Sequence, residues 1–71
     1  MFHKLHIKGM TCEHCKKAVE DALRKHEAVK EVKVNLGEGT ADLEAIRDMR
    51  FDELNDVIEN AGYELVKIEK K

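Results

Sequence analysis

Hydrophobic and polar residues follow two different periods along the chain. Residues 2–8 alternate, with Leu5 and Ile7 on one face and lysines and a histidine on the other, which is typical of a strand with one buried face. Residues 13–26 and about 48–61 instead carry apolar side chains at helical spacing. Gly62 stands where a glycine commonly ends a helix. The pattern therefore predicts one strand and two amphipathic helices, and the start of the second helix is its least defined boundary.

Three further segments alternate with a period of two. Residues 32–36 and 40–45 flank Gly37-Glu38-Gly39, which predicts two strands joined by a tight turn. Residues 63–68 predict a last strand, in which Val66 and Ile68 fit the buried phase better than Leu65. The resulting order is βαββαβ. Two βαβ halves with right-handed crossovers predict an α+β, ferredoxin-like fold, a four-stranded antiparallel sheet with both helices on one face.

Composition limits the classes of function. The 71 residues contain no proline and no Gly or Ser tract that would mark a linker, so we expect a single domain over residues 1–71. A formal net charge of −2 and three scattered aromatic residues give no basis for binding nucleic acid. No apolar run approaches the length that inserts into a membrane, and the first residues lack the features of a secretory signal. These features predict a cytoplasmic protein.

The candidate chemistry lies between the first strand and the first helix. Cys12 and Cys15 are three residues apart at the helix N-terminus, where free backbone N–H groups and the positive end of the helix favour thiolate over thiol. In a reducing compartment such a pair is a metal or redox site rather than a structural disulfide. Two thiolates suit a two-coordinate, thiophilic ion such as Cu(I) or Hg(II) better than Zn(II), which prefers four ligands.

The run from Gly9 to Cys15, GMTCEHC, resembles the GMTCxxC signature of heavy-metal-associated domains, a family that includes bacterial copper chaperones and the N-terminal domains of copper-transporting ATPases. Ala61-Gly62-Tyr63 before the last strand also fits this family, so the resemblance covers nearly the whole chain. It implies Cu(I) binding through Cys12 and Cys15, and transfer by thiol exchange to a copper-transporting ATPase or its metal-binding domain. Arg50-Phe51 departs from the family, which often has a capping serine and a proline there.

The resemblance also assigns roles around the cysteines. The neutral Thr11 favours Cu(I), since relatives that prefer Zn(II), Cd(II) or Pb(II) tend to place a carboxylate there. Met10 is expected to pack under the loop rather than bind metal, and Glu13 and His14 to tune the loop, with ligation by His14 as an alternative. Tyr63 is expected near the loop, where its ring would shield the thiolates and its hydroxyl would bond a sulfur.

Other functions stay open at this point. The ion is Cu(I), or alternatively Ag(I), Hg(II) or Zn(II), and the chain is a free chaperone or a domain of an ATPase. Two copies sharing one ion through four cysteines would form a metal-bridged homodimer. A CxxC redox protein is less favoured because thioredoxins have a longer chain and a cis-proline. We do not expect an enzyme.

Two sets of charged residues offer further alternatives. His3, His6 and His26 are interpreted as scattered surface histidines rather than as ligands of a Cys₂His₂ zinc site. Lys16 and Lys17 flank the cysteine loop, which suggests that a partner with an acidic surface docks there.

Overall fold

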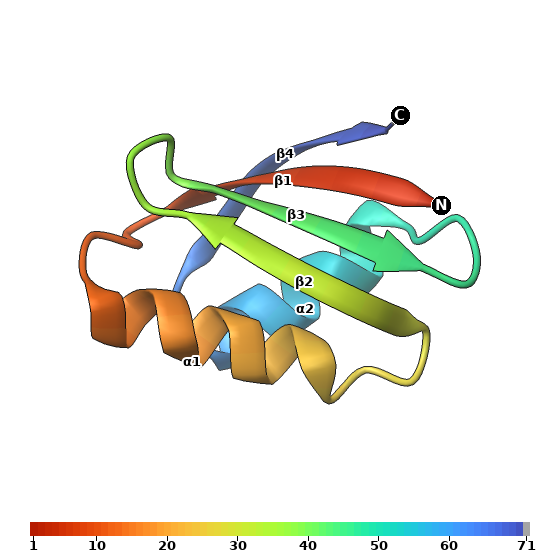
Figure 1. Ribbon diagram of the computed structural model, residues 1–71, viewed down its shortest axis with the longest axis horizontal. Helices are drawn as coiled ribbons and strands as arrows, with labels where there is room; N and C mark the ends of the chain where they lie inside the picture. The colour runs from red at the N-terminus through yellow and green to blue at the C-terminus, as the bar shows by residue number, and fades with distance from the viewer. Residues whose placement is uncertain (71) are drawn as a thin grey trace.

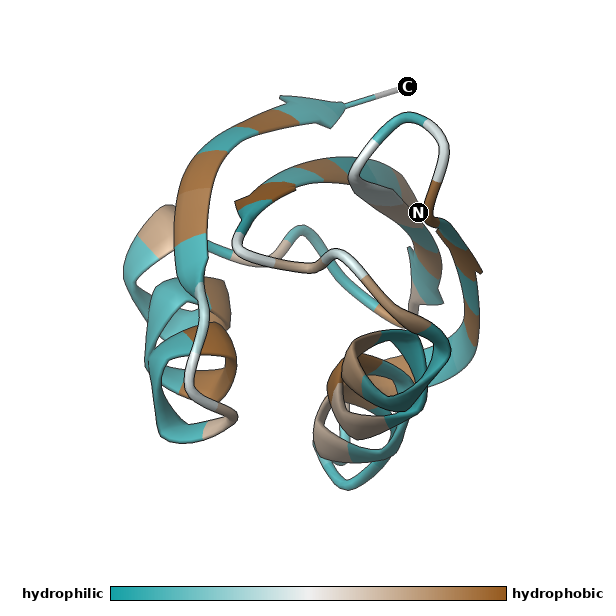
Figure 2. Cartoon of the chain, turned by 90° about the vertical axis from the view of Figure 1, so that its left-hand side faces the viewer, coloured by the Kyte–Doolittle hydropathy of each residue, from teal (hydrophilic) through white to brown (hydrophobic). Residues whose placement is uncertain are grey.

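The structure, a computed structural model that describes residues 1–70, has the predicted βαββαβ order (Figure 1). The four strands form one antiparallel sheet in the order β2-β3-β1-β4, so β1 lies inside the sheet and pairs with both β3 and β4. Both helices cover the same face of this curved sheet (Figure 2). The ferredoxin-like arrangement is therefore confirmed. The elements are β1 Phe2–Lys8, α1 Glu13–Arg24, β2 Val29–Asn35, β3 Thr40–Ala45, α2 Phe51–Asn60 and β4 Glu64–Lys70.

The core lies between the sheet and the helices. The inward residues of each strand meet one stripe from each helix, as the two hydrophobic periods predict. Met10 and Met49 also belong to this core, since they are 4% and 0% exposed. The other fully buried side chains of greatest volume are Leu5, Leu23, Leu43, Leu54, Ile58, His3 and Val19.

Helix α2 begins later than the pattern around residue 48 suggested. Arg50 is still extended, with φ −84° and ψ 154°, and its N–H donates to Glu53 Oε1 at 3.2 Å. A glutamate at the third helical position thus caps the helix, so α2 starts without the capping serine and proline that the resemblance led us to compare. Asp48 lies outside the helix, in the segment that follows β3.

The interpretation of β4 was wrong at two residues. Leu65 is buried at 4% exposure, while Val66 is 58% exposed. His6 pairs with Lys67 and Ile7 with Leu65, so Val66 is an extra residue on β4 that has no counterpart on β1. This β-bulge reverses the phase of alternation along the strand and turns Val66 outward.

The interpretation of His3 as a surface residue was also wrong. His3 alternates inward with Leu5 and Ile7, and it is only 2% exposed. His6 lies on the outer face of β1, where its Nε2 is 3.1 Å from Glu69 Oε2. The two histidines therefore project from opposite faces of one strand, as the alternation predicts.

Candidate metal centre

The loop that carries the cysteines is anchored on both sides. Gly9 ends β1 with a φ of +94°, a conformation that glycine adopts without strain. Met10 then enters the core, and Cys12 takes an extended conformation with φ −143° immediately before α1. The first helical hydrogen bond runs from Lys16 N–H to the Cys12 carbonyl, at 2.9 Å. The loop therefore connects the end of β1 to the N-terminus of α1 in four residues.

The two sulfur atoms face each other at this helix end. Cys12 Sγ and Cys15 Sγ are 3.1 Å apart, and both cysteines are free. This separation exceeds the roughly 2.05 Å of a disulfide and lets one sulfur share the other's proton. Cys12 is exposed and Cys15 is half-buried. Both sulfurs are thus available to a soft metal ion, and Cys12 is the more accessible.

The surroundings favour the thiolate form of Cys15. A hydrogen bond from the Tyr63 hydroxyl, then one from the Cys12 thiol and one from the Thr11 backbone, lower the pKa of Cys15 from 9.0 to about 6. The same contact with the Cys15 thiolate raises the pKa of Tyr63. At neutral pH, Cys15 is therefore mostly in the thiolate form.

Tyr63 lies beside the loop because α2 ends just before it. Its N–H donates to the Ile58 carbonyl at 3.0 Å, and Gly62 has a φ of +93°, so the chain reverses sharply after the helix. A β-carbon at Gly9 would lie 3.5 Å from Tyr63 Cδ1, which places the ring against the loop. The sequence analysis did not assign this contact to Gly9, although Gly9 is the first residue of the GMTCxxC motif.

The remaining predicted residues lie around the sulfurs without adding a ligand cluster. Thr11, Glu13 and His14 are exposed, and Met10 is 4% exposed within the core. Across residues 1–70, no group of three or more His, Cys, Asp or Glu side chains is placed to hold a metal ion. The zinc site of Cys₂His₂ type that the histidines suggested as an alternative is therefore not formed in this part of the chain. The loop thus presents two free sulfurs that face each other.

In residues 1–70, the two helices are too short and too polar to span a membrane.

The model of the heavy-metal-associated domain family matches residues 4–64, a range that includes both cysteines and Tyr63. Copper chaperone CopZ of Bacillus subtilis (strain 168) is 38% identical over 64 residues, which cover 89% of this chain and 93% of that protein.

Two solved structures extend the likeness to the fold. One described as CopZ metallochaperone has a TM-score of 0.83 and 35% identity, covering 93% of this chain and 100% of that one. A copper binding domain from HMA7, a P-type ATPase, has a TM-score of 0.81 and 29% identity, covering 99% of this chain and 100% of that one. These matches span almost the full length of each chain.

Proposed function

Since the chain belongs to the heavy-metal-associated domain family, we propose that it is a copper chaperone, which carries Cu(I) between the Cys12 and Cys15 thiolates and passes it to a partner by thiol exchange. The observation that carries the proposal is the pair of free sulfurs 3.1 Å apart on an exposed loop. The likeness to proteins named as copper chaperones supports it. The role is carriage of an ion rather than catalysis.

The donor set supports Cu(I) over harder ions. Soft thiolate ligands select Cu(I), and this soft monovalent ion is satisfied by two of them. Zn(II) prefers four ligands, and the exposed Thr11 beside the sulfurs brings no carboxylate. Ag(I) and Hg(II) share the preference for sulfur, so they are the competitors that a binding experiment must include.

The difference between the two cysteines suggests an order of exchange. Cys12 is exposed, whereas Cys15 is half-buried and bonded by Tyr63. An incoming partner thiolate forms a bond to Cu(I), and the bond to Cys12 breaks first, which releases Cys12 as a thiolate. A second partner thiolate then displaces Cys15. The ion stays bonded to sulfur throughout.

Metal competition tests the binding step. Reduced protein is titrated anaerobically with Cu(I) against a competing chelator, beside Cys12→Ser, Cys15→Ser and a parallel series with Zn(II), Ag(I) and Hg(II). We expect one Cu(I) per chain, with affinity lost in either cysteine variant and retained in Asp56→Ser, a change to serine at an exposed position on α2. Weak Cu(I) binding together with a readily cycled disulfide would favour a redox protein instead. Sedimentation of the loaded protein tests whether two copies share the ion.

Transfer to a partner is tested separately. The expected acceptor is a copper-transporting ATPase or its metal-binding domain, and the likeness to a domain of a P-type ATPase makes membership of such an enzyme the second candidate. Reversing the charges of Lys16 and Lys17 is expected to slow transfer to an acidic acceptor, because complementary charge accelerates encounter. The matched control reverses Lys30 and Lys33, which are exposed on β2. Equal transfer rates in both variants would argue against docking through α1.

Cell fractionation separates the two candidates and tests the cytoplasmic location. A chaperone is expected in the cytoplasmic fraction as a chain of 71 residues. Recovery in the membrane fraction as part of a longer polypeptide would favour the ATPase domain.

A further inference from the structure

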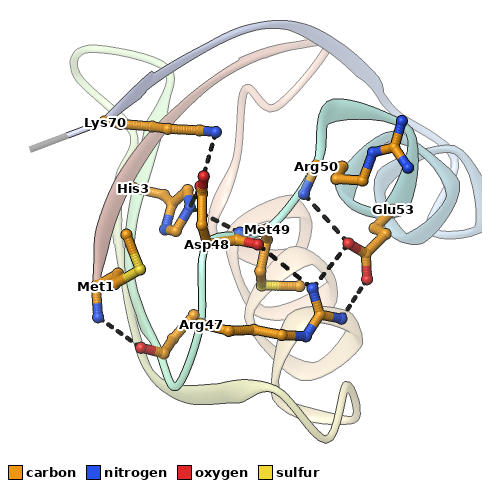
Figure 3. A network of polar contacts seen from close by, with 9 residues as sticks. Met1, His3, Arg47, Asp48, Met49, Arg50, Glu53 and Lys70 are labelled. Carbon is orange, nitrogen blue, oxygen red and sulfur yellow. Dashed lines mark hydrogen bonds and ion pairs between the residues drawn. The ribbon is translucent and has the colours of Figure 1, made fainter.

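His3 is a buried polar side chain that the metal site does not use. It lies on β1 with its side chain 0% exposed, and its partners come from the segment that joins β3 to α2 (Figure 3). Its Nε2 is 3.1 Å from the backbone nitrogen of Met49 and 3.3 Å from Asp48 Oδ1. Among the described residues, its Nδ1 is buried without a hydrogen-bond partner. One ring nitrogen therefore faces two partners of opposite character.

These two contacts need different forms of the ring. The Met49 N–H is a donor, so Nε2 accepts from it only in the neutral ring with the proton on Nδ1. The Asp48 carboxylate is an acceptor, so it bonds only an Nε2 that carries a proton. Nε2 cannot accept and donate a hydrogen bond at the same time. Gain or loss of a proton at Nε2 therefore decides whether His3 bonds Asp48 or Met49.

The charges around the ring favour the bond to Met49 when the ring is neutral. Lys70, paired with His3 across β1 and β4, places its Nζ 2.7 Å from Asp48 Oδ1 and so satisfies that carboxylate. The hydrogen bond from Lys70 is the largest cause that holds the pKa of Asp48 below its usual range. The Met1 amine faces the Ala45 carbonyl at 2.6 Å.

The charged groups of the next residues are engaged with each other. Arg47 bonds both oxygens of Glu53, and its Nη1 also lies 3.4 Å from the Asp48 carbonyl. From the strands, the connecting segment and α2, the titratable group that contacts the ring is therefore Asp48, with Lys70 behind it.

We propose that His3 is a proton-operated latch on the segment between β3 and α2. With the ring neutral, Nε2 accepts the Met49 N–H and fixes the segment against the core, where the Met49 side chain is 0% exposed. When the ring takes a proton from solvent at Nε2, it donates to Asp48, and the Met49 N–H loses its acceptor. Histidine is the side chain that changes charge between about pH 5 and 8, so acidification operates the latch.

The latch lies away from the cysteine loop, at the other end of β1, and it acts on the segment that leads into α2. The proton is gained or lost at the Nε2 nitrogen of His3, and no metal ion takes part. It is therefore independent of whether the proposed copper carriage is correct. The expected change is local, in the protection of the Met49 amide.

Nuclear magnetic resonance on the full chain tests the latch. With ¹⁵N-labelled protein, the His3 ring is expected to carry its proton on Nδ1 at pH 8 and on both nitrogens at pH 5. Over the same range, protection of the Met49 amide against hydrogen exchange is expected to fall about fivefold relative to its intrinsic rate, the effect of losing one net hydrogen bond.

Two variants make the test specific. In His3→Gln, a side-chain carbonyl that does not titrate replaces Nε2 as the acceptor, so the pH dependence of Met49 protection is expected to vanish. His6→Gln, a change on the outer face of the same strand, is expected to retain it. A His3 ring that stays neutral at pH 5, or Met49 protection that does not change with pH, would overturn the proposal. If His3→Gln does not fold, the ring tautomer in the unsubstituted protein still decides.

Discussion

Removal of the Tyr63 hydroxyl is the sharpest test of how the structure prepares the sulfur pair. Four hydrogen bonds lower the pKa of Cys15 from 9.0 to about 6 against the opposing effect of burial, and the bond from Tyr63 is the largest of them. It therefore accounts for at least a quarter of the fall. In Tyr63→Phe the pKa of Cys15 is expected to rise to about 7 or above, so the thiolate fraction at pH 7 drops from roughly nine-tenths to about half or less.

The assay is the rate of alkylation by iodoacetamide as a function of pH, with each cysteine followed separately by peptide mass. Following both matters because Cys12 and Cys15 share a hydrogen bond, so a change at one sulfur affects the other. The matched control is Thr11→Val. Thr11 acts on Cys15 through its backbone N–H, so loss of its side-chain hydroxyl is expected to leave the pKa of Cys15 in place.

Two results would refute this reasoning. If the alkylation profile of Cys15 is the same in Tyr63→Phe and the unsubstituted protein, the tyrosine hydroxyl does not stabilise the thiolate. If Thr11→Val raises the pKa as far as Tyr63→Phe does, the cause is a general disturbance of the loop. The phenylalanine keeps the ring against Gly9, so a change confined to Tyr63→Phe isolates the hydroxyl.

The remaining predictions concern stability. Pairing with Arg47 depresses the pKa of Glu53 to about 2 from its usual 4.5, so its contribution to folding is present above about pH 4.5 and is lost as the pH falls toward 2. Arg47→Gln is therefore expected to lower the thermal midpoint at pH 7, and to lower it progressively less toward pH 2. The control Arg24→Gln removes an exposed ion pair within α1 and is expected to have little effect. A decrease in the midpoint of Arg47→Gln that is the same at all pH values would contradict this. Leu54→Ala, at a fully buried position, is expected to reduce the free energy of unfolding by about 2–5 kcal/mol in chemical denaturation. Ile46→Ala, at 67% exposure, is expected to stay within about 0.5 kcal/mol, and equal losses in both variants would contradict the burial of Leu54.

The sequence predicted those features that depend on a period within one element. The two helices and the inward face of β1 follow directly from the spacing of apolar residues, because a residue's face is determined by its position in the repeat. The order βαββαβ then leaves few topologies.

What the sequence did not predict depends on contacts between elements. Val66 is turned outward because β4 has one residue more than β1 at that point, and alternation within β4 alone does not show this. The start of α2 depends on Glu53 reaching back to Arg50, at a position where relatives use other residues. His3 looked like a surface residue because histidine is commonly exposed, and its burial became clear only with Met49 and Asp48 beside it.

In the candidate site, too, the pattern of residues predicted the features that lie within one segment and not those that depend on contacts between elements. The cysteines, their helix end and the preference for a soft ion follow from residue types and spacing. The lowered pKa of Cys15 does not, because its largest cause is the hydrogen bond from Tyr63, which is distant in the sequence and reaches the loop only after α2 ends. The resemblance to a family predicted that Tyr63 lies near the loop. The structure adds that its hydroxyl lowers the pKa of Cys15.

A carrier needs a fold that does not depend on its cargo, and the way this loop is held meets that need. The loop is fixed by Met10 within the core and by Tyr63 against Gly9, while the side chain of Cys12 makes no capping bond to α1. In zinc fingers, by contrast, the metal supplies the folding energy, and removing it unfolds the domain. Here the residues that hold the loop are not the two cysteines, so they hold it without a bound ion. We therefore infer that an ion held by these two sulfurs is released without unfolding the domain, so that binding strength is set by the thiolates and not by the stability of the fold.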